Sequence, residues 1–256
     1  MLQLVSACGP FEIGRGTRPP QAWGYQDVAR HLTSLGVGSP VAAPLEVLEA
    51  GGGSASHVPL PAGARITTID ISPEQLARNT YAAETLLGDL QTFDFGTRRF
   101  DLVVIWDVLE HLQRPEAALD RLAAVLRPGG RLVVVGPLPS SLKGLVTRLT
   151  PHRLHVLFYR HVLGSKTAGE PGHAPFPTAH AAGAAPDRIA DVLTQRGLTV
   201  DALTVFESIH VAALARRSPV AHMLYRGAEH ALSALTFGRV IRAATDFCLV
   251  ASRRSA

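Results

Sequence analysis

A run of glycines and a later aspartate are the first residues whose types and spacing could bind a ligand. The segment Glu49-Ala50-Gly51-Gly52-Gly53-Ser54 follows Pro44 to Leu48, an apolar run typical of a short buried strand. Glycines at a strand-to-helix turn let the backbone approach a ligand closely. Asp70 follows Gly51 by 19 residues, after a second predicted strand, where a carboxylate can accept hydrogen bonds from both ribose hydroxyls. Together they predict a nucleoside site.

The glycine spacing distinguishes two classes of nucleoside ligand. A dinucleotide fingerprint needs G-x-G-x-x-G, with the pyrophosphate at a helix N-terminus. Gly51 and Gly53 have no third glycine at the required place, so a nucleotide-dependent oxidoreductase is disfavoured. Glu49 precedes the turn, and its charge would repel a pyrophosphate but suits a ligand with sulfonium and ammonium groups. The electrostatics therefore favour S-adenosylmethionine (SAM).

Five sequence segments support this prediction by their order and spacing along the chain. They are Val47 to Gly53, Thr68 to Ser72, Gly88 to Leu90, Phe100 through Leu112, and Leu126 to Leu132. In these segments the chain resembles the class I SAM-dependent methyltransferases, especially the small-molecule enzymes of quinone and natural-product biosynthesis. The resemblance is strong over roughly residues 44–137, although Ala55 replaces the usual third glycine of the first motif.

The resemblance implies which residues contact the cofactor. Asp70 would hold the ribose, Asp89 the adenine amino group, and Trp106 would line the adenine or sulfonium region. The predicted set is Glu49, Ala50, Gly51, Gly52, Gly53, Asp70, Ile71, Asp89, Leu90, Trp106, Asp107 and Val108. Two of these have structural alternatives, because Asp89 can simply cap a turn and Trp106 can be a core residue.

Strand and helix signals alternate over about 90 residues, which predicts right-handed βαβ units and a parallel sheet covered on both faces. Ser72 as N-cap and Pro73 in the first turn predict a helix start. Further helices are predicted over Gln21 to Leu35 and Pro115 to Leu126. Pro128-Gly129-Gly130 is expected to be a structural turn.

The resemblance implies one Rossmann-like α/β domain over residues 1–256. Its sheet would be seven-stranded and mostly parallel, with helices on both faces and an antiparallel last strand. Residues 1–40 would form an N-terminal arm and helix. Two irregular stretches, 138–185 and 207–244, follow the fifth and sixth strands, at the edge where ligands bind. We expect both insertions to cover the active face, and their apolar content predicts a hydrophobic acceptor.

Histidines in the first insertion are candidates for the catalytic base. Methylation of a hydroxyl requires removal of its proton, and the pKa of histidine suits this near neutrality. We prefer His152 or His155, with His111 as a further candidate that can also simply brace its helix. Three other histidines of the insertion are His161, His173 and His180. A metal site from His152-x-x-His155 is less favoured because carboxylates are sparse nearby.

Composition limits the remaining function classes. The chain is 46% apolar and 18% charged, and its net charge of +4 is scattered, which is weak support for a nucleic-acid surface. Two distant cysteines, the lack of a signal-like start and the lack of a long apolar run predict a cytoplasmic protein, at most peripheral to a membrane.

The sequence therefore predicts O-methylation of a small hydrophobic, hydroxylated or lipid-like acceptor. Trp106-Asp107-Val108-Leu109 replaces the Asn/Asp-Pro-Pro-aromatic turn that many amino-methylating enzymes of nucleic acids and proteins carry. Two alternatives stay open, C-methylation of similar substrates and an inactive SAM-binding scaffold. In the scaffold, an amphipathic helix from Val220 to Leu235 would dock on a membrane or a partner.

Overall fold

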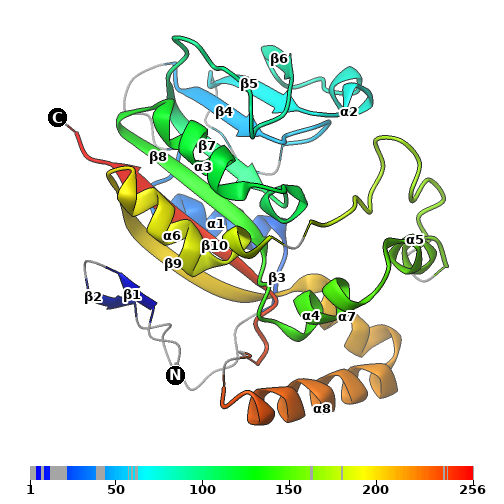
Figure 1. Cartoon of the computed structure of the whole chain (residues 1–256). Helices are drawn as coiled ribbons and strands as arrows, with labels where there is room; N and C mark the ends of the chain where they lie inside the picture. The colour runs from blue at the N-terminus through cyan, green and yellow to red at the C-terminus, as the bar shows by residue number, and fades with distance from the viewer. Residues whose placement is uncertain are drawn as a thin grey trace.

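A mixed β-sheet flanked by helices forms the centre of the molecule (Figure 1). The computed structural model describes residues 4–6, 9–11, 22–38, 44–56, 58, 60, 63–161, 164–179, 181–238, 240 and 242–255, with the backbone alone at 4–6, 9–11 and 210. Within them, eight strands lie in the order β3 (Ala22–Trp23), β9 (Leu198–Ser208), β10 (Asp246–Arg253), β8 (Leu126–Pro137), β7 (Phe100–Trp106), β4 (Glu46–Ala50), β5 (Arg65–Asp70), β6 (Glu84–Leu87).

The sheet topology confirms the predicted fold class. Strands β4, β5, β6, β7 and β8 pair in parallel, and the last strand, β10, is antiparallel to both β8 and β9. The carboxyl ends of the parallel strands therefore meet at one edge. The short strand β3 is an addition to the seven predicted strands, and it pairs in parallel with the end of β9.

The start of the first helix was predicted too early. Trp23 belongs to β3, and α1 spans Tyr25–Ser34. Gly24 is the extended N-cap residue, and its amide donates to the Asp27 carboxylate at 2.9 Å. Because this hydrogen bond satisfies an amide that the first turn would leave unpaired, the helix begins after Gly24.

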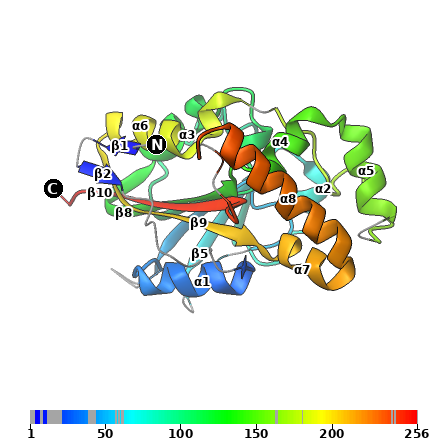
Figure 2. The same ribbon diagram turned by 90° about the horizontal axis from the view of Figure 1, so that it is seen from below.

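Alternating side chains of the central strands cover both faces of the sheet. In β7, Val103 and Ile105 pack with α3 (Pro115–Ala124) and α6 (Pro186–Gln195). The neighbouring residues Leu102 and Val104 pack on the opposite face with α1. Figure 2 shows α1 on the opposite side of the sheet from α3 and α6. This two-sided burial explains the near-continuous apolar runs of the parallel strands.

Local signals at element ends were mostly correct. The Ser72 hydroxyl accepts from the Gln75 amide and caps α2 (Pro73–Ala77), as predicted. Helix α3 was predicted to extend to Leu126, but it ends at Ala124, and Leu126 is the first residue of β8. The expected Pro-Gly-Gly turn lies inside β8, where the register with β7 shifts and Gly129 has a φ of +78°.

Four helices leave the carboxyl edge of the sheet and gather on one side of the molecule (Figures 1 and 2). They are α4 (Leu142–Leu149) and α5 (His152–His161) after β8, and α7 (Ile209–Arg217) and α8 (Pro219–Leu235) after β9. Two 3-10 turns also lie within the described residues, η1 (Leu109–His111) and η2 (Ala182–Ala184). Within the described chain, no helix has both the length and the hydropathy for crossing a bilayer.

The N-terminal segment is described only in part. Strands β1 (Leu4–Ser6) and β2 (Gly9–Phe11) pair antiparallel. The rest of the predicted arm up to residue 20 lies outside the described residues. Cys248 is a buried free thiol in β10, and Cys8 is outside the described residues.

Candidate functional site

The glycine turn after β4 has a left-handed backbone at its first position, which glycine adopts without strain. Gly51 has a φ of +74°, and its amide donates to the Ile69 carbonyl at 2.7 Å. A Cβ atom on Gly51 would lie 2.3 Å from Cγ2 of Val108. Gly53 also has a positive φ, of +50°. The turn therefore needs glycine both for its conformation and for close contact with the segment after β7.

Side chains that follow β5 hold this turn in place. The Asn79 amide donates to the Gly53 carbonyl at 2.7 Å. The Tyr81 hydroxyl donates to the Gly52 carbonyl at 3.1 Å. The turn is thus fixed from the side of the sheet that carries Asp70.

Glu49 lies buried beneath the turn, with 4% of its surface exposed. Its Oε1 atom accepts from the Ser56 hydroxyl, whereas Oε2 is buried and has no hydrogen-bond partner among the described residues. Burial raises the pKa of this carboxyl, and the nearby Ser56 and Tyr81 hydroxyls oppose the shift. Glu49 and Trp106 help to line a cavity of about 20 Å³, so a residue with an unsatisfied carboxylate oxygen borders a small cavity.

Asp70 lies at the end of β5, next to the glycine turn. Its Oδ1 atom accepts from the Ser72 amide at 2.8 Å, and Oδ2 lies 3.4 Å from the position of a Cβ on Gly53. Burial raises the pKa of the Asp70 carboxyl. Ile71, the next residue, has 69% of its surface exposed. The structure thus brings together the two groups on which the nucleoside prediction depends.

Asp89 and Leu90 occupy the turn after β6. Both carboxylate oxygens of Asp89 accept from the side-chain amide of Gln91, at 3.0 and 3.1 Å. The backbone N–H of Gln91 also donates to Oδ1, at 2.8 Å. The Leu90 side chain is buried in the core. Asp89 therefore does cap a turn, and its contact with adenine stays a prediction.

A cluster of charged groups follows β7, and the sequence indicated only part of it. Asp107 has a positive φ of 51°, and Glu110 lies in the next turn of chain. Lys143 of α4 forms an ion pair with Asp246 of β10 at 2.8 Å. Burial, followed by the negative charge of Glu110, raises the pKa of Asp107, and burial raises the pKa of Glu110. Three segments distant in sequence supply these groups, the turn after β7, α4 and β10, so no local pattern could have joined them.

His111 has a fixed tautomer at the edge of this cluster. Its Nδ1 atom lies 2.7 Å from the Pro177 carbonyl oxygen. Because a carbonyl can only accept, Nδ1 carries the proton and Nε2 presents its lone pair in the neutral ring. Nε2 lies 3.9 Å from Oε1 of Glu110. Burial lowers the pKa of His111, so the ring is a neutral acceptor near pH 7.

Aromatic side chains flank the charged cluster on two sides. The Tyr25 ring lies 5.5 Å from the Trp106 ring, and 51% of Tyr25 is exposed. On the other side, the Phe176 ring meets the His111 ring edge-on at 6.1 Å, and 38% of Phe176 is exposed. These rings offer accessible apolar surface beside the polar groups.

The histidines preferred from the sequence lie on α5. The Nε2 atom of His155 lies 2.5 Å from the Thr150 hydroxyl. The Nδ1 atom of His152 is buried without a hydrogen-bond partner among the described residues. His180 lies outside the described residues. In the part of the chain that the structure describes, no three His, Cys, Asp or Glu side chains group as metal ligands.

Residues 172–179 form a strap, not anticipated as such from the sequence, across the edge that carries the glycine turn. At one end, the Gly172 carbonyl accepts from Gln75 at 2.9 Å, next to α2. At the other end, the Ala179 amide donates to the Glu110 carbonyl at 2.8 Å. Because β4 lies between β5 and β7 in the sheet, the strap spans the end of β4.

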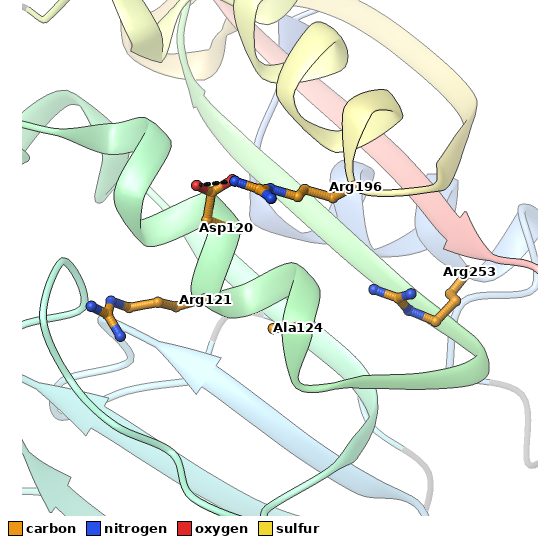
Figure 3. Close-up of a pocket in the computed structure, with 5 residues that line it drawn as sticks. All are labelled: Asp120, Arg121, Ala124, Arg196 and Arg253. Atoms are coloured by element: carbon orange, nitrogen blue, oxygen red, sulfur yellow. Dashed lines mark hydrogen bonds and ion pairs between the residues drawn. The ribbon is translucent and has the colours of Figure 1, made fainter.

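A hollow of about 380 Å³ lies beside α3, α6 and the end of β10 (Figure 3). It is lined by Asp120, Arg121, Ala124, Arg196 and Arg253. These residues lie near the ends of α3, α6 and β10, at the amino ends of the parallel strands. Arg196 is already paired with Asp120 by two hydrogen bonds, at 2.6 and 2.7 Å. Ligands of open α/β sheets bind at the opposite edge, so we do not assign the site here.

Known proteins match the same part of the chain. Residues 48–134 match a family model described as Methyltransferase domain. The chain is 30% identical over 153 residues to an uncharacterized methyltransferase of Mycobacterium tuberculosis, covering 58% of this chain and 57% of that protein. It is 33% identical over 98 residues to the ubiquinone biosynthesis O-methyltransferase of Xylella fastidiosa, covering 33% and 37% of the two chains.

The fold likeness extends further than the sequence match. A solved SAM-dependent methyltransferase from Mesorhizobium loti has a TM-score of 0.54 and 16% identity, covering 90% of this chain and 100% of that one. At this identity the likeness concerns the fold alone. The matched segment spans a little over half the length of the Mycobacterium relative, 57%.

Alanine at Gly51 is expected to destabilise the fold by about 3 kcal/mol, because Cβ would collide with Val108. Gly63 is the matched control, since it has a φ of +89° but nothing within 4 Å of the added Cβ. Gly63→Ala should lower the free energy of unfolding by only about 1 kcal/mol, because alanine is strained in a left-handed backbone conformation. Urea unfolding measures both, and adding Val108→Ala should recover part of the Gly51→Ala loss. Equal losses at the two glycines would contradict the close-contact account.

The raised pKa of Glu110 predicts a pH-dependent stability change. The unfolded chain ionises this carboxyl near its ordinary pKa of 4.5, before the folded chain does. Stability contributed by the neutral carboxyl is therefore present at low pH and falls as pH rises towards neutrality. Glu110→Gln should be more stable than wild type by about 1 to 2 kcal/mol near pH 8, with no gain near pH 4.

Thermal and urea unfolding across this pH range measure the effect. Glu74→Gln is the control, because the Ser72 hydroxyl lowers the pKa of Glu74, and this variant should gain nothing at high pH. A loss of stability in Glu110→Gln at every pH would instead mean that the ionised carboxylate supports the fold.

Proposed function

Because the chain belongs to the class I SAM-dependent methyltransferase family, we propose that it methylates a hydroxyl oxygen of a small hydrophobic molecule. SAM is the cofactor of this family. The proposal rests on one observation, that residues suited to bind the cofactor and a residue suited to act as a base lie at the same edge of the sheet. The Gly51–Gly53 turn and Asp70 lie on one side, and the neutral, oriented His111 lies on the other.

The residues at the glycine turn fit this cofactor. The turn packs tightly against the segment after β7, since a Cβ on Gly51 would collide with Val108, and its glycine backbone would let the cofactor approach closely. Asp70 would accept hydrogen bonds from the ribose hydroxyls. Glu49 has a buried oxygen without a partner beside a small cavity, and an ammonium group would satisfy it. Bound there, SAM supplies an electrophilic methyl group.

The remaining cofactor contacts are proposed from neighbouring residues. Ile71, exposed beside Asp70, would lie against the nucleoside, and Asp89 would receive the adenine amino group. The strap over residues 172–179 would limit access of water to this edge. Trp106 ends β7, Asp107 and Val108 follow it, and all three would face the reacting end.

On the acceptor side, His111 is the proposed general base. Its Nδ1–H is held by the Pro177 carbonyl, so Nε2 could accept the proton of the acceptor hydroxyl while the methyl carbon leaves the sulfonium sulfur for that oxygen. The negative charge of Asp107, which favours the charged form of His111, would stabilise the protonated ring. His152 and His155 stay as alternative bases, although the hydrogen bond of His155 goes to Thr150.

Two observations support a hydrophobic, ring-containing acceptor. Phe176 and Tyr25 expose apolar surface on either side of the charged cluster, and aromatic rings stack or meet edge-on with other rings. The Xylella fastidiosa relative is named as a ubiquinone biosynthesis O-methyltransferase, which favours an aromatic hydroxyl.

Asp70→Asn should weaken SAM binding about 10- to 100-fold, because hydrogen bonds to a charged acceptor are each worth about 1.5–3 kcal/mol. Isothermal titration calorimetry with purified protein measures this change. Asp94→Asn is a matched control, since its Oδ1 also accepts an amide two residues later, at 2.8 Å, in an exposed turn. Unchanged SAM binding in Asp70→Asn, or no binding by folded wild type, would refute the proposed cofactor site.

His111→Gln should lower kcat at neutral pH by about 100-fold or more. Because the pKa of His111 is lowered from 6.5, the wild-type rate should fall only below that pH, and the variant should lose this limb. Methylation of a panel of catechols, hydroquinones and polyketide phenols, read by mass spectrometry, measures both. His152→Gln and His155→Gln are run in parallel.

The outcomes separate the competing roles. A loss of methylation confined to the His152 or His155 variant would identify that histidine of α5 as the base. Methyl groups found on ring carbon would replace O-methylation by C-methylation. SAM binding without methylation of any acceptor in the panel would favour the inactive scaffold.

A further inference from the structure

Helix α8 has its polar face turned inward and its apolar face turned outward. On the inner face, Arg226 forms ion pairs with Glu207 of β9 and with Glu229, which is 1% exposed. The outer face exposes Val220, Met223, Leu224, Ala228, Ala231 and Leu235. A helix that borders water usually exposes its polar face instead, so this face is suited to contact with a second surface.

Helices α4 and α5 add to the same kind of surface. Leu154, Leu157 and Phe158 recur at helical spacing on α5, and each is about half exposed, between 49% and 50%. On α4, Leu149 is 73% exposed. These helices gather with α7 and α8 on one side of the molecule (Figures 1 and 2). We refer to α4, α5, α7 and α8 together as the helical surface.

The charges of the helical surface are almost entirely positive. Its exposed arginines include Arg148, Arg153, Arg216 and Arg217. Among residues 142–149, 152–161, 209–217 and 219–235, Glu229 is the only carboxylate, and it is buried against Arg226. Exposed apolar side chains bordered by arginine are complementary to the headgroups and acyl boundary of an anionic bilayer.

A second copy of the chain would be a poorer occupant. In a twofold interface the same patch contacts itself, so arginines would face arginines without an exposed carboxylate on these helices to pair with them. Like charges facing one another oppose association. An anionic lipid surface neutralises the arginines and buries the apolar side chains together.

We propose that the helical surface docks the protein on membranes that contain anionic lipids. Resting on the proposed function, this surface would let an acceptor dissolved in the bilayer reach the site directly. Helix α7 begins immediately after β9 ends, and Lys143 of α4 contacts Asp246 at the carboxyl edge of the sheet. Docking would thus hold the acceptor side of the site against the lipid.

Vesicle cosedimentation of the full chain tests this proposal without SAM or acceptor, so its failure is distinct from failure of methyl transfer. We expect binding to phosphatidylcholine vesicles that contain about one third phosphatidylglycerol, and at least about tenfold weaker binding to pure phosphatidylcholine. Raising the salt concentration should weaken the binding in part, because the apolar contribution is not screened.

Two double variants separate the contributions. Arg216→Glu with Arg217→Glu should weaken binding about tenfold or more by reversing two charges. Met223→Glu with Leu224→Glu should do the same by placing charge on the apolar face. The matched control is Arg98→Glu with Arg99→Glu, another exposed arginine pair that lies between β6 and β7, and it should bind like wild type.

Light scattering and thermal unfolding complete the test. Each variant must melt within a few degrees of wild type for its binding to be compared. Equal binding to both kinds of vesicle, or equal loss in the control pair, would overturn the proposal. So would a wild-type mass twice 27.2 kDa that returns to the monomer value in Met223→Glu with Leu224→Glu, because a second copy would then cover α8.

Discussion

The contact between Gly51 and Val108 joins the two halves of the site. It places the turn after β4 directly against the segment after β7, and it exists only because residue 51 has no Cβ. The cradle for a nucleoside and the charged cluster around Asp107 therefore share one wall. In the sheet, β4 and β7 are neighbours, so parallel pairing brings the two segments to the same edge. Changes at this contact should affect both cofactor binding and acceptor chemistry.

Burial of charge is the second property on which the account depends. Asp107 and Glu110 hold raised pKa values because water is partly excluded and because like charges lie close together. Lys143, which is paired with Asp246, supplies the opposing positive charge. Such an arrangement costs stability at neutral pH and is typical of functional sites. It also ties α4, which belongs to the exposed helical surface, to the chemistry at the sheet edge.

The local part of this description could be predicted from the sequence, and the long-range part could not. Strand–helix alternation, the Ser72 cap and the order of the segments follow from neighbouring residues, as does the glycine turn with Asp70. The strap from Gly172 to Ala179 depends on contacts with residues some 70 to 100 positions away. The sequence predicts that α8 is amphipathic, but it does not show which face points outward. That orientation depends on Glu207 of β9, which forms an ion pair with Arg226. Trp23 followed helical spacing, yet pairing with β9 placed it in a strand.

A crystal structure of the chain with S-adenosylhomocysteine bound would show where the cofactor lies between the glycine turn and His111. We predict that its ribose lies at Asp70, its ammonium group lies near Glu49, and its sulfur faces the space between Asp107 and His111. Such a structure would support both the cofactor cradle and the acceptor side. A nucleoside in the hollow between Asp120 and Arg253, or a sulfur directed away from His111, would contradict it.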